Sequence, residues 1–412
     1  MTALAASERA TLPRLLAGIR RGGGAVSLRE HVGIHGELPQ VGEKLIGLVE
    51  SAGLTGRGGA AFPTARKLAA VAAGGRSVVV ANGVEGEPAS AKDKVLLRRV
   101  PHLVLDGVSA AADAVGAEEA VVAVADDAHE EHDALAAALA ERGRHGLDGV
   151  PIRVATAPDR FVAGEETAVV QVLNGGPAKP TFTPPRPFER GVRGRPTLVQ
   201  NVETLAHLAL IARFGPRWFR GLGTADEPGT ALVTLDGAVG RRGVYELPLG
   251  TPLQQLFSWA GEPTSPLQAV LVGGYFGTWV DARDAVRLEL SDASLGTVGA
   301  SLGARTIIAL PTGVCGVVET TRIARYLAGE SAGQCGPCVH GLDAVAGAWE
   351  RLARRKARPG QELERLDRWT RQIAGRGACR HPDGALRIVE SALTVFADEL
   401  HRHERGLCTE RR

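Results

Sequence analysis

The chain has 412 residues, of which 44% are apolar, enough to build the cores of about two to four domains. Its 48 Lys and Arg residues nearly balance 46 Asp and Glu residues, and a net charge of +2 argues against a nucleic-acid partner. The sequence contains no apolar run of about eighteen residues, so we expect no segment that spans a membrane.

The N-terminus and the cysteines indicate a cellular compartment. Met1 to Leu16 lack the uninterrupted apolar core of a secretory signal. Five cysteines, two of them in a Cys-x-x-Cys pair, suit metal or redox use in a reducing compartment better than a disulfide framework. We therefore expect a cytoplasmic protein.

The first half of the chain alternates short β-rich runs with helical stretches. The β-rich runs are Ser77–Asn82, Ala120–Ala125 and Ile152–Ala155, and helical spacing appears in His129–Arg144 and Thr197–Phe214. This alternation predicts an α/β layer built on a largely parallel sheet.

The pattern changes after Gly229. Three further runs, Ala231–Leu235, Gly243–Leu247 and Ala269–Val272, have strand character and surround one short predicted helix, Pro252–Trp259. A small α+β module fits this pattern.

After Thr320 the strand signals end. The segments Cys338–Ala357, Glu362–Ile373 and Asp383–His401 are charged and helical in period. We predict a C-terminal helical bundle, and it carries the Cys-x-x-Cys pair.

A glycine-rich stretch, Gly53 to Thr64, precedes a helix predicted to start near Pro63. It contains the run Gly-Arg-Gly-Gly-Ala. Such a loop lets backbone N–H groups approach a phosphate, and the helix N-terminus adds a favourable dipole. The stretch is neither a dinucleotide Gly-x-Gly-x-x-Gly motif nor a Walker loop, and a tight turn without a ligand is the alternative.

Two acidic clusters follow in the front half. Asn82-Gly83-Val84-Glu85-Gly86-Glu87-Pro88 comes directly after a predicted strand, and Gly164-Glu165-Glu166-Thr167 opens a predicted helix. Loops after strand ends are where α/β sheets bind ligands. These carboxylates can accept hydrogen bonds from ribose hydroxyls or a flavin edge, or they are solvated loop acids and a helix start favoured by the dipole.

The run from Glu330 to Cys338 resembles an iron–sulfur ligand loop. Its Gly and Pro residues allow Cys335 and Cys338 to converge, and Cys379 follows about forty residues later. Three candidate thiolates stand where four are usual.

Taken in order, these motifs and Asn201-Val202-Glu203-Thr204 resemble the FMN- and NADH-binding flavoprotein subunit of respiratory complex I, in the family of NADH-quinone oxidoreductase F subunits. Related subunits occur in NAD-linked hydrogenases and formate dehydrogenases. The resemblance runs from about Gly53 to His401. It implies an FMN-binding α/β domain, a small α+β ubiquitin-like (SLBB) domain near Gly229–Ala282, and a helical bundle with one [4Fe–4S] cluster. The expected boundaries are an N-terminal extension at 1–45, the FMN domain at 46–226, the SLBB domain at 227–284, a linker at 285–320 and the cluster domain at 321–405.

The resemblance also implies site residues. Around the FMN phosphate and ribityl chain it places Gly56, Arg57, Gly58, Lys67, Asn201 and Thr204. Along the flavin it places Asn82, Glu85, Gly164 and Glu165. Facing the dinucleotide it places Phe62, Glu87 and Glu166, the two acids being the candidate catalytic residues, and as cluster ligands it places Cys335, Cys338 and Cys379.

The implied reaction is hydride transfer from a nicotinamide to flavin N5, followed by one-electron steps to the cluster. Flavin is needed because a nicotinamide delivers two electrons whereas an iron–sulfur centre accepts one. The implied partners are a pyridine nucleotide and ferredoxin-like or other electron-transfer subunits.

Several positions depart from the family. Val84 stands where an aspartate is usual beside the flavin, and Gln200 replaces the first of two asparagines. Ala70 and Arg186 replace two phenylalanines expected to stack on the dinucleotide, and Thr183 replaces a lysine. Because stacking on a base contributes about 1–3 kcal/mol, these changes predict weaker NADH binding unless Arg186 stacks or meets a 2′-phosphate.

The first cluster cysteine is replaced by Ala332. A cluster held by three cysteines can take water, His340 or His381 at its fourth iron, and a neutral ligand there would raise its potential. A [3Fe–4S] cluster is a second outcome. The third is no cluster, with Cys335 and Cys338 left as a redox pair or as inert thiols.

Cys315 and Cys408 match no ligand position and are expected to be structural or incidental. The basic run at 351–358 is interpreted as a solvated helix end, with docking of an acidic ferredoxin as the alternative.

Two functions therefore compete. One is an electron-transfer flavoprotein subunit, which would be yellow-brown. The other is a cofactor-poor scaffold or assembly subunit, which would be colourless. The retained acids Glu87, Glu165 and Glu166 favour the first function, whereas Val84, Ala70 and Ala332 favour the second.

Overall fold

The computed structural model describes residues 11–356, 358 and 360–408. They form two compact units. The first unit comprises residues up to 86, 91–233 and 244–250, and the second comprises 87–90, 234–243 and the chain from 251 onward. Each unit is described by itself below.

The first unit is built on a four-stranded parallel sheet. Its strands are β1 (Ser77–Gly83), β2 (Ala117–Ala125), β3 (Ile152–Ala157) and β4 (Thr197–Asn201), in the order β3-β2-β1-β4. The central strand β1 is buried along nearly its whole length, as expected for a parallel sheet covered on both faces. The predicted α/β layer is confirmed.

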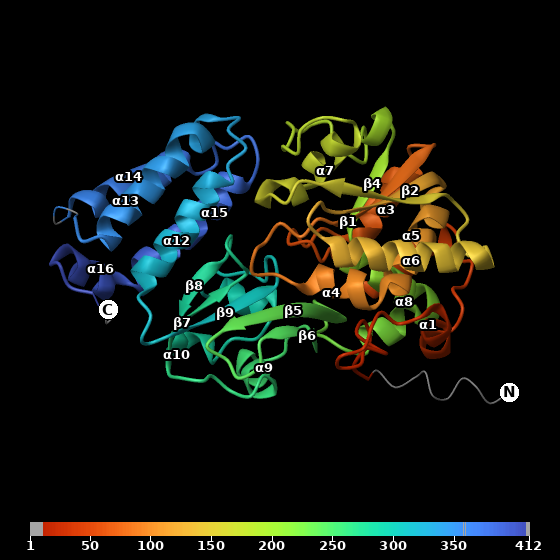
Figure 1. Cartoon of the computed structure of the whole chain (residues 1–412), viewed down its shortest axis with the longest axis horizontal. Coiled ribbons are helices and arrows are strands. Elements are labelled where there is room, and N and C mark those ends of the chain that lie inside the picture. The colour runs from red at the N-terminus through yellow and green to blue at the C-terminus, as the bar shows by residue number, and fades with distance from the viewer. Residues whose placement is uncertain (1–10, 357, 359, 409–412) are drawn as a thin grey trace. The chain divides into compact units, whose positions relative to one another are not determined.

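Alternate residues of β1 face two different apolar cores. Val79 and Ala81 belong to the larger core, whereas Val78 and Val80 belong to a smaller one. Helices cover the face of the sheet that carries the larger core (Figure 1). The smaller core, on the other face, is closed by η1 (Phe161–Gly164) and α7 (Glu166–Leu173). The larger core takes side chains from α2 (Lys44–Ala52), α3 (Thr64–Ala72), α4 (Lys92–Arg99), α5 (Pro101–Val115), α6 (His129–His145) and α8 (Val202–Arg220). The other helical elements of this unit are α1 (Leu28–His35) and the short turn η2 (Val192–Gly194).

Helices α5 and α8 pack with their backbones almost in contact. A Cβ atom added at Gly107 of α5 would lie 2.0 Å from the carbonyl oxygen of Leu205 in α8. Any larger residue would push the two helices apart, so the sequence needs glycine at this crossing.

The prediction of one helix over Thr197–Phe214 is wrong at its start. Residues Thr197–Asn201 form strand β4, which pairs in parallel with β1. The apolar run suits either structure, and pairing with a buried strand outweighs helix propensity there. The Asn201 side chain then accepts a hydrogen bond from the Glu203 amide at 3.0 Å and starts α8.

The second unit contains a mixed sheet. Strand β9 (Thr306–Pro311) lies between β5 (Thr230–Gly237) and β7 (Leu267–Val272), parallel to the first and antiparallel to the second, and β8 (Thr278–Asp281) pairs with β7. Three short helices accompany these strands: α9 (Leu253–Trp259), α10 (Ala282–Ala285) and α11 (Asp292–Gly296). Strand β6 (Gly243–Pro248) lies mostly in the first unit, and β5 continues from one unit into the other. Strand β9 lies in the stretch that was predicted to be a linker.

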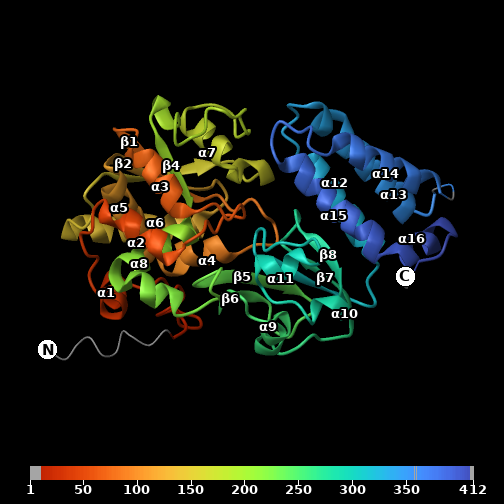
Figure 2. The ribbon, with the colours of Figure 1, turned by 180° about the vertical axis from the view of Figure 1, so that it is seen from behind.

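The C-terminal part of the second unit is helical, as predicted. It contains α12 (Gly316–Gly329), the π-helical turn η3 (Pro337–Gly341), α13 (Leu342–Ala353), α14 (Gln361–Ile373), α15 (His381–Val395) and α16 (Ala397–Glu404). Figures 1 and 2 both show α12 to α15 lying alongside one another, with fully buried Trp349 of α13 in their core. The predicted segment Asp383–His401 is interrupted at Phe396, which separates α15 from α16 and packs on Gly316. Among the described residues, no helix combines the length and apolar character needed to cross a bilayer.

Candidate flavin, nucleotide and cluster sites

The predicted flavin residues meet at the carboxyl edge of the parallel sheet. Asn82 near the end of β1 is paired in register with Asn201 at the end of β4. The motif at residues 82–88 begins at the end of β1, and the motif at residues 201–204 begins at the end of β4 and continues into α8. This edge is where open α/β sheets bind ligands.

The glycine-rich loop lies on the N-terminus of α8. The Arg57 amide donates to the Thr204 hydroxyl at 2.8 Å, and the Gly56 amide closes the loop on the Phe62 carbonyl at 2.9 Å. A Cβ atom at Gly58 would lie 3.3 Å from Cβ of Asn201. The loop therefore brings bare backbone against Asn201 at the end of β4, and α3 starts next to the loop without a side-chain cap.

The Arg57 side chain turns away from this backbone. Its exposed fraction is 1%, and its guanidinium donates to the Thr55 hydroxyl at 2.9 Å and to the Thr230 carbonyl at 3.2 Å. The predicted phosphate contact of Arg57 can therefore come from its loop backbone, while its guanidinium ties the loop to β5.

Lys67 and Glu166 form an ion pair. The Lys67 ammonium lies 2.6 Å from Oε2 of Glu166 and donates to the Val199 carbonyl at 3.1 Å. The pair joins α3 to the first turn of α7, and both side chains remain partly exposed. It sets one positive and one negative group at the same edge of the sheet.

The loops carrying the two acidic clusters approach backbone to backbone. A Cβ at Gly164 would lie 2.5 Å from the Val84 carbonyl oxygen, and one at Gly86 would lie 2.6 Å from that of Phe161. The Asn82 amide also donates to the Gly164 carbonyl at 2.8 Å. The loop residues around Val84 and Gly86 therefore lie against Phe161 and Gly164, and glycine is required where the two backbones touch.

Glu85 and Glu165 accept hydrogen bonds at helix starts. The Glu85 carboxylate accepts the amides of Asp93 and Lys94 at 3.2 and 3.1 Å, in the first turn of α4. The Glu165 carboxylate accepts the Thr167 amide at 2.8 Å and caps α7. Burial raises the pKa of Glu165, and these hydrogen bonds oppose that rise.

A buried charge cluster beneath Asn201 was not predicted from the sequence. The Lys92 ammonium lies 2.6 Å from Asp93 and 3.1 Å from Glu203, and the Asn201 amide donates to Asp93 at 2.6 Å. Burial raises the pKa of Asp93, and the Lys92 charge opposes that rise. Lys92 and Asp93 closely follow the Glu-Gly-Glu-Pro motif, but nothing in that run showed that they turn inward. The cluster fixes the orientation of the Asn201 amide.

The replaced family positions differ in their surroundings. Val84 is buried in the smaller apolar core, where an aspartate would need polar partners. Ala70 is partly buried, whereas Arg186 is exposed. Two aromatic rings of this unit are open to solvent: Phe62, which was predicted, is 44% exposed, and Phe182, which was missed, is 76% exposed.

Glu87 belongs to the second unit. Its carboxylate accepts the Tyr275 amide at 2.8 Å, and a Cβ at Gly274 would lie 2.6 Å from its Oε2. Glu87 therefore holds the turn between β7 and β8, where Gly274 has a φ of +80°.

The predicted cluster cysteines lie in two turns of the helical part. Cys335 lies just before the turn η3, Cys338 lies within η3, and Cys379 lies between α14 and α15. Burial raises the pKa of Cys338, as does the nearby Cys335 thiol, whereas a hydrogen bond with the Ser331 side chain lowers it. Ser331 directly precedes buried Ala332, so an oxygen lies beside the position that lacks a thiolate.

The two candidate histidines differ. His340 is exposed. His381 is buried, its Nε2 lies 2.8 Å from the Leu327 carbonyl oxygen, and its ring packs edge-on against Phe276 at 5.4 Å. Burial lowers the pKa of His381. These contacts give His381 a packing role between α15 and α12.

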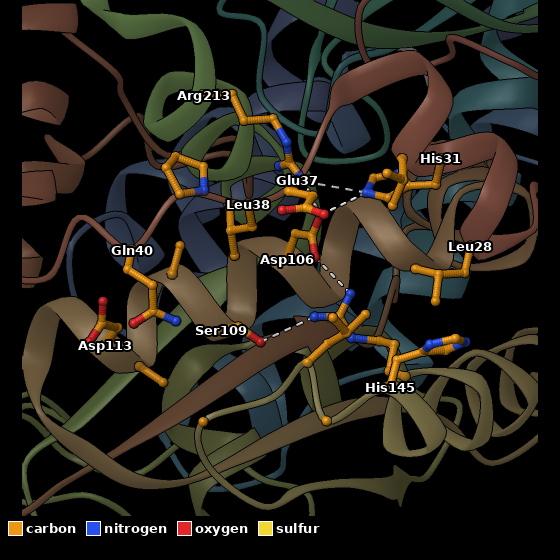
Figure 3. A pocket seen from close by; sticks show the side chains of 18 of the residues that line it. Leu28, His31, Glu37, Leu38, Gln40, Asp106, Ser109, Asp113, His145 and Arg213 are labelled. Atoms are coloured by element: carbon orange, nitrogen blue, oxygen red, sulfur yellow. Dashed lines mark hydrogen bonds and ion pairs between the residues drawn. The ribbon is translucent and has the colours of Figure 1, made fainter.

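A separate cavity of about 930 Å³ lies at the opposite edge of the parallel sheet. Gly116 and Gly149, at the amino ends of β2 and β3, contribute to its lining. Figure 3 shows Asp106 among the lining residues, with His31 and Arg213 beside it. The Asp106 carboxylate lies 2.7 Å from His31 and 2.6 Å from Arg142, and Arg213 is a further partner. None of the predicted flavin residues lines this cavity.

Comparison with known proteins finds two family matches, one to an FMN-binding domain and one to an iron-sulfur binding region. Residues 49–210 match the family described as the Nuo51 FMN-binding domain, and residues 319–403 match the NADH-ubiquinone oxidoreductase-F iron-sulfur binding region. The NADH-quinone oxidoreductase F subunit numbered 2 of Rhizobium meliloti is 33% identical, with 94% of each chain covered. The NADH-quinone oxidoreductase F subunit of Mycobacterium tuberculosis (strain ATCC 25618 / H37Rv) is 31% identical over 88% of this chain and 85% of the relative.

A solved structure is also similar. The crystal structure of an NAD+-reducing [NiFe]-hydrogenase in the H2-reduced state matches with a TM-score of 0.81 and 31% identity, covering 88% of this chain. The match spans 62% of the hydrogenase chain. The similarity thus extends over most of the sequence.

Proposed function

Because this chain belongs to the family of NADH-quinone oxidoreductase F subunits, we propose that it passes electrons between a pyridine nucleotide and partner subunits through FMN and an iron–sulfur cluster. The observation that carries the proposal is the meeting of Asn82, Asn201 and the glycine-rich loop at one edge of the sheet. FMN, when bound, would accept one hydride, which carries two electrons, and would release the electrons one at a time.

The sheet edge fits a flavin mononucleotide. The backbone at Gly56 and Gly58 has no side chain in the way, and the uncapped start of α3 offers amide donors to a phosphate. Lys67 adds a positive charge, the Asn82 amide would supply a polar contact along the ring system, and Asn201 would supply one toward the phosphate and ribityl chain. Val84 removes one acidic contact, so we infer weaker FMN binding than an aspartate would give.

On the nucleotide side, we infer that Phe62, Phe182 and Glu166 contact the dinucleotide. The two exposed aromatic rings offer stacking surfaces in place of those lost at Ala70 and Arg186. The Glu166 carboxylate is held by Lys67 and can orient a ribose or carboxamide group. For Glu87 we infer a role within the second unit, where its carboxylate holds the turn between β7 and β8.

For the cluster, we infer ligation by Cys335, Cys338 and Cys379. The fourth iron then takes water or the Ser331 hydroxyl, because the His381 Nε2 already contacts the Leu327 carbonyl. An oxygen ligand makes the cluster less negative than a fourth thiolate would, and its potential should rise.

Three further assignments belong to the proposal. We infer that residues 227–284 and strand β9 form an SLBB module, that the protein works in the cytoplasm, and that its partners are ferredoxin-like or other electron-transfer subunits. The near-neutral net charge of +2 fits docking by local charge patches, such as the basic run at 351–358, better than by a long-range field.

The test is an anaerobic visible spectrum of the purified full chain, with flavin and iron quantified before NADH is added. We expect about one FMN per chain, a broad iron–sulfur absorption, and bleaching of the flavin bands by NADH. Protein that stays colourless after reconstitution with FMN, iron and sulfide would contradict the proposal and favour a scaffold role. If the flavin bands bleach only with reduced ferredoxin, then ferredoxin and not NADH is the electron donor.

A further inference from the structure

A second group of metal-type ligands lies away from the predicted cluster cysteines. The Sγ atoms of Cys315 and Cys408 and a ring nitrogen of His403 all lie within 4.8 Å of one another. Within the described part of the chain, this is the group of Cys, His and acidic residues compact enough to share one ion. Cys315 precedes α12, His403 lies in α16, and Cys408 follows α16.

We propose that Cys315, His403 and Cys408 bind a zinc ion that holds the C-terminal segment to the start of α12. Thiolate sulfur and imidazole nitrogen are the ligand types that zinc prefers, and such soft ligands disfavour magnesium and calcium. A closed structural zinc site needs one further protein ligand beside these three. Cys315 and His403 are buried, as a structural site requires.

The His403 ring is already oriented for this role. Its Nδ1 lies 3.0 Å from the Leu352 carbonyl oxygen at the end of α13, so Nδ1 carries the proton. The unprotonated Nε2 then faces Cys315 Sγ at 3.2 Å. Metal-binding histidines commonly have one nitrogen fixed by a backbone carbonyl in this way, which sets the tautomer and the direction of the other nitrogen.

Glu399 lies beside Cys315 and holds the backbone that follows it. It lies one turn before His403 on α16, and its Oε2 accepts the Gly316 amide at 2.8 Å while lying 3.6 Å from Cys315 Sγ. The carboxylate therefore fixes the backbone that presents Cys315. It also offers an oxygen that can complete a tetrahedral shell, with water as the alternative.

The ion would close a long loop. Cys315 and Cys408 are 93 positions apart (408 − 315), and the chain between them contains the whole helical part that carries Cys335, Cys338 and Cys379. A metal that binds only the folded chain adds its binding free energy to folding, so loss of the ion should lower the melting temperature.

The experiment measures zinc and iron in the purified full chain and in two variants. Cys408→Ala removes a partly exposed ligand near the end of the chain, and Cys335→Ala removes a predicted cluster ligand as the matched control. We expect about one zinc per chain in the wild type and in Cys335→Ala, and less than about a tenth of that in Cys408→Ala. X-ray absorption at the zinc edge should show two sulfur neighbours at about 2.3 Å.

Three results would overturn the proposal. Zinc that disappears in Cys335→Ala but persists in Cys408→Ala would place the ion on the cluster cysteines. Wild-type protein without zinc after incubation with one equivalent, or with a Cys315–Cys408 disulfide detected by mass spectrometry, would show that the two thiols serve otherwise. If Cys408→Ala fails to fold, His403→Gln replaces it, because this variant keeps both thiols and removes only the imidazole.

Discussion

At the scale of single residues, most side chains of the flavin edge contact backbone groups. We use this name for the proposed flavin site at the carboxyl edge of the parallel sheet, where Asn82, Asn201 and the glycine-rich loop meet. Arg57 and Glu85 contact main-chain groups, and Lys67 contacts both a carbonyl and Glu166. A sequence motif shows which residue types are present, but it does not show whether a long side chain turns toward the ligand or the core. The position of Arg57 was therefore predictable, whereas the direction of its guanidinium was not.

Arg57 offers a direct test of this difference. Arg57→Ala should lower the free energy of unfolding of the cofactor-free protein by about 2–4 kcal/mol, because the Thr55 and Thr230 oxygens lose a buried charged donor. Urea unfolding measures this change. Arg153→Ala, at an exposed position of β3, is the control and should change stability by less than about 0.5 kcal/mol. Equal effects in both variants would contradict a core role for Arg57.

Glu166 separates flavin binding from nucleotide use. In Glu166→Gln the Lys67 ammonium loses its ion pair but stays at the FMN edge, so flavin content should be unchanged. The rate at which NADH bleaches the flavin should fall by about tenfold or more, which corresponds to about 1.4 kcal/mol. Anaerobic stopped-flow absorbance gives the rate. A variant that loses FMN but keeps the bleaching rate of its remaining flavin would reverse the assignment.

The buried imidazole of His35 should make the free energy of unfolding fall in acid. Burial lowers its pKa to about 3, and the nearby charges of His31 and Arg213 add to this. The unfolded chain takes up a proton near pH 6.5 while the folded chain does not, so stability is full above that pH and falls as the pH drops toward 3.

His35→Leu should flatten this dependence by up to about 1.4 kcal/mol per pH unit, one proton's worth. Urea unfolding between about pH 7 and about pH 4.5 measures the slope, in a range above the titration of most carboxyls. His132→Leu, exposed on α6, serves as the control. An unchanged slope in His35→Leu would show that other groups, such as buried His102, account for the loss.

At the scale of elements, the close approach of the loops after β1 and before α7 builds the flavin edge. Sequence patterns located β1, β2, β3 and α6 to within a few residues because each has a clear period and flanking turn residues. The boundary between β4 and α8 was missed, since a buried apolar run has no period that distinguishes strand from helix. Strand β9 was missed for a related reason: it is short, and its partners lie far away in sequence.

Gly164 tests the importance of that approach. Gly164→Ala would place Cβ 2.5 Å from the Val84 carbonyl oxygen, which must move by about an ångström to relieve the clash. We expect loss of at least about 2 kcal/mol in unfolding free energy and of most bound FMN, measured by urea unfolding and flavin fluorescence. Gly143→Ala is the opposite control: it lies in α6 with open space around it and should stabilise the helix by up to about 1 kcal/mol. Normal flavin content in Gly164→Ala would show that the loops need not touch.

At the scale of the whole molecule, the two units differ in their chemistry. The first carries the flavin edge and the separate cavity around Asp106, and the second carries the cysteines, Glu87 and the proposed zinc site. The sequence predicted continuous domains at 46–226, 227–284 and 321–405, whereas the two compact units are each made of separate chain segments. Contacts between residues distant in the sequence, such as Glu87 with Tyr275, could not be inferred without the fold.

Isolated residues 251–408 should not fold independently. This fragment lacks residues 87–90 and 234–243, which belong to the same compact unit and include Glu87 and the part of β5 that pairs with β9. Circular dichroism of the purified fragment should show no cooperative melting transition, whereas the full chain should show one. A sharp transition in the fragment would mean that β7, β8 and β9 are sufficient without β5.

The division of residues between the units also has a consequence for inheritance. The backbone passes from one unit to the other five times, at 86/87, 90/91, 233/234, 243/244 and 250/251. A single genetic crossover anywhere between 86 and 251 therefore separates pieces of at least one unit from their partners. Recombination that exchanges one unit for that of a distant relative must therefore replace all chain segments of that unit together. In such a chimaera, the Glu87–Ser90 segment must come from the same parent as the rest of the second unit.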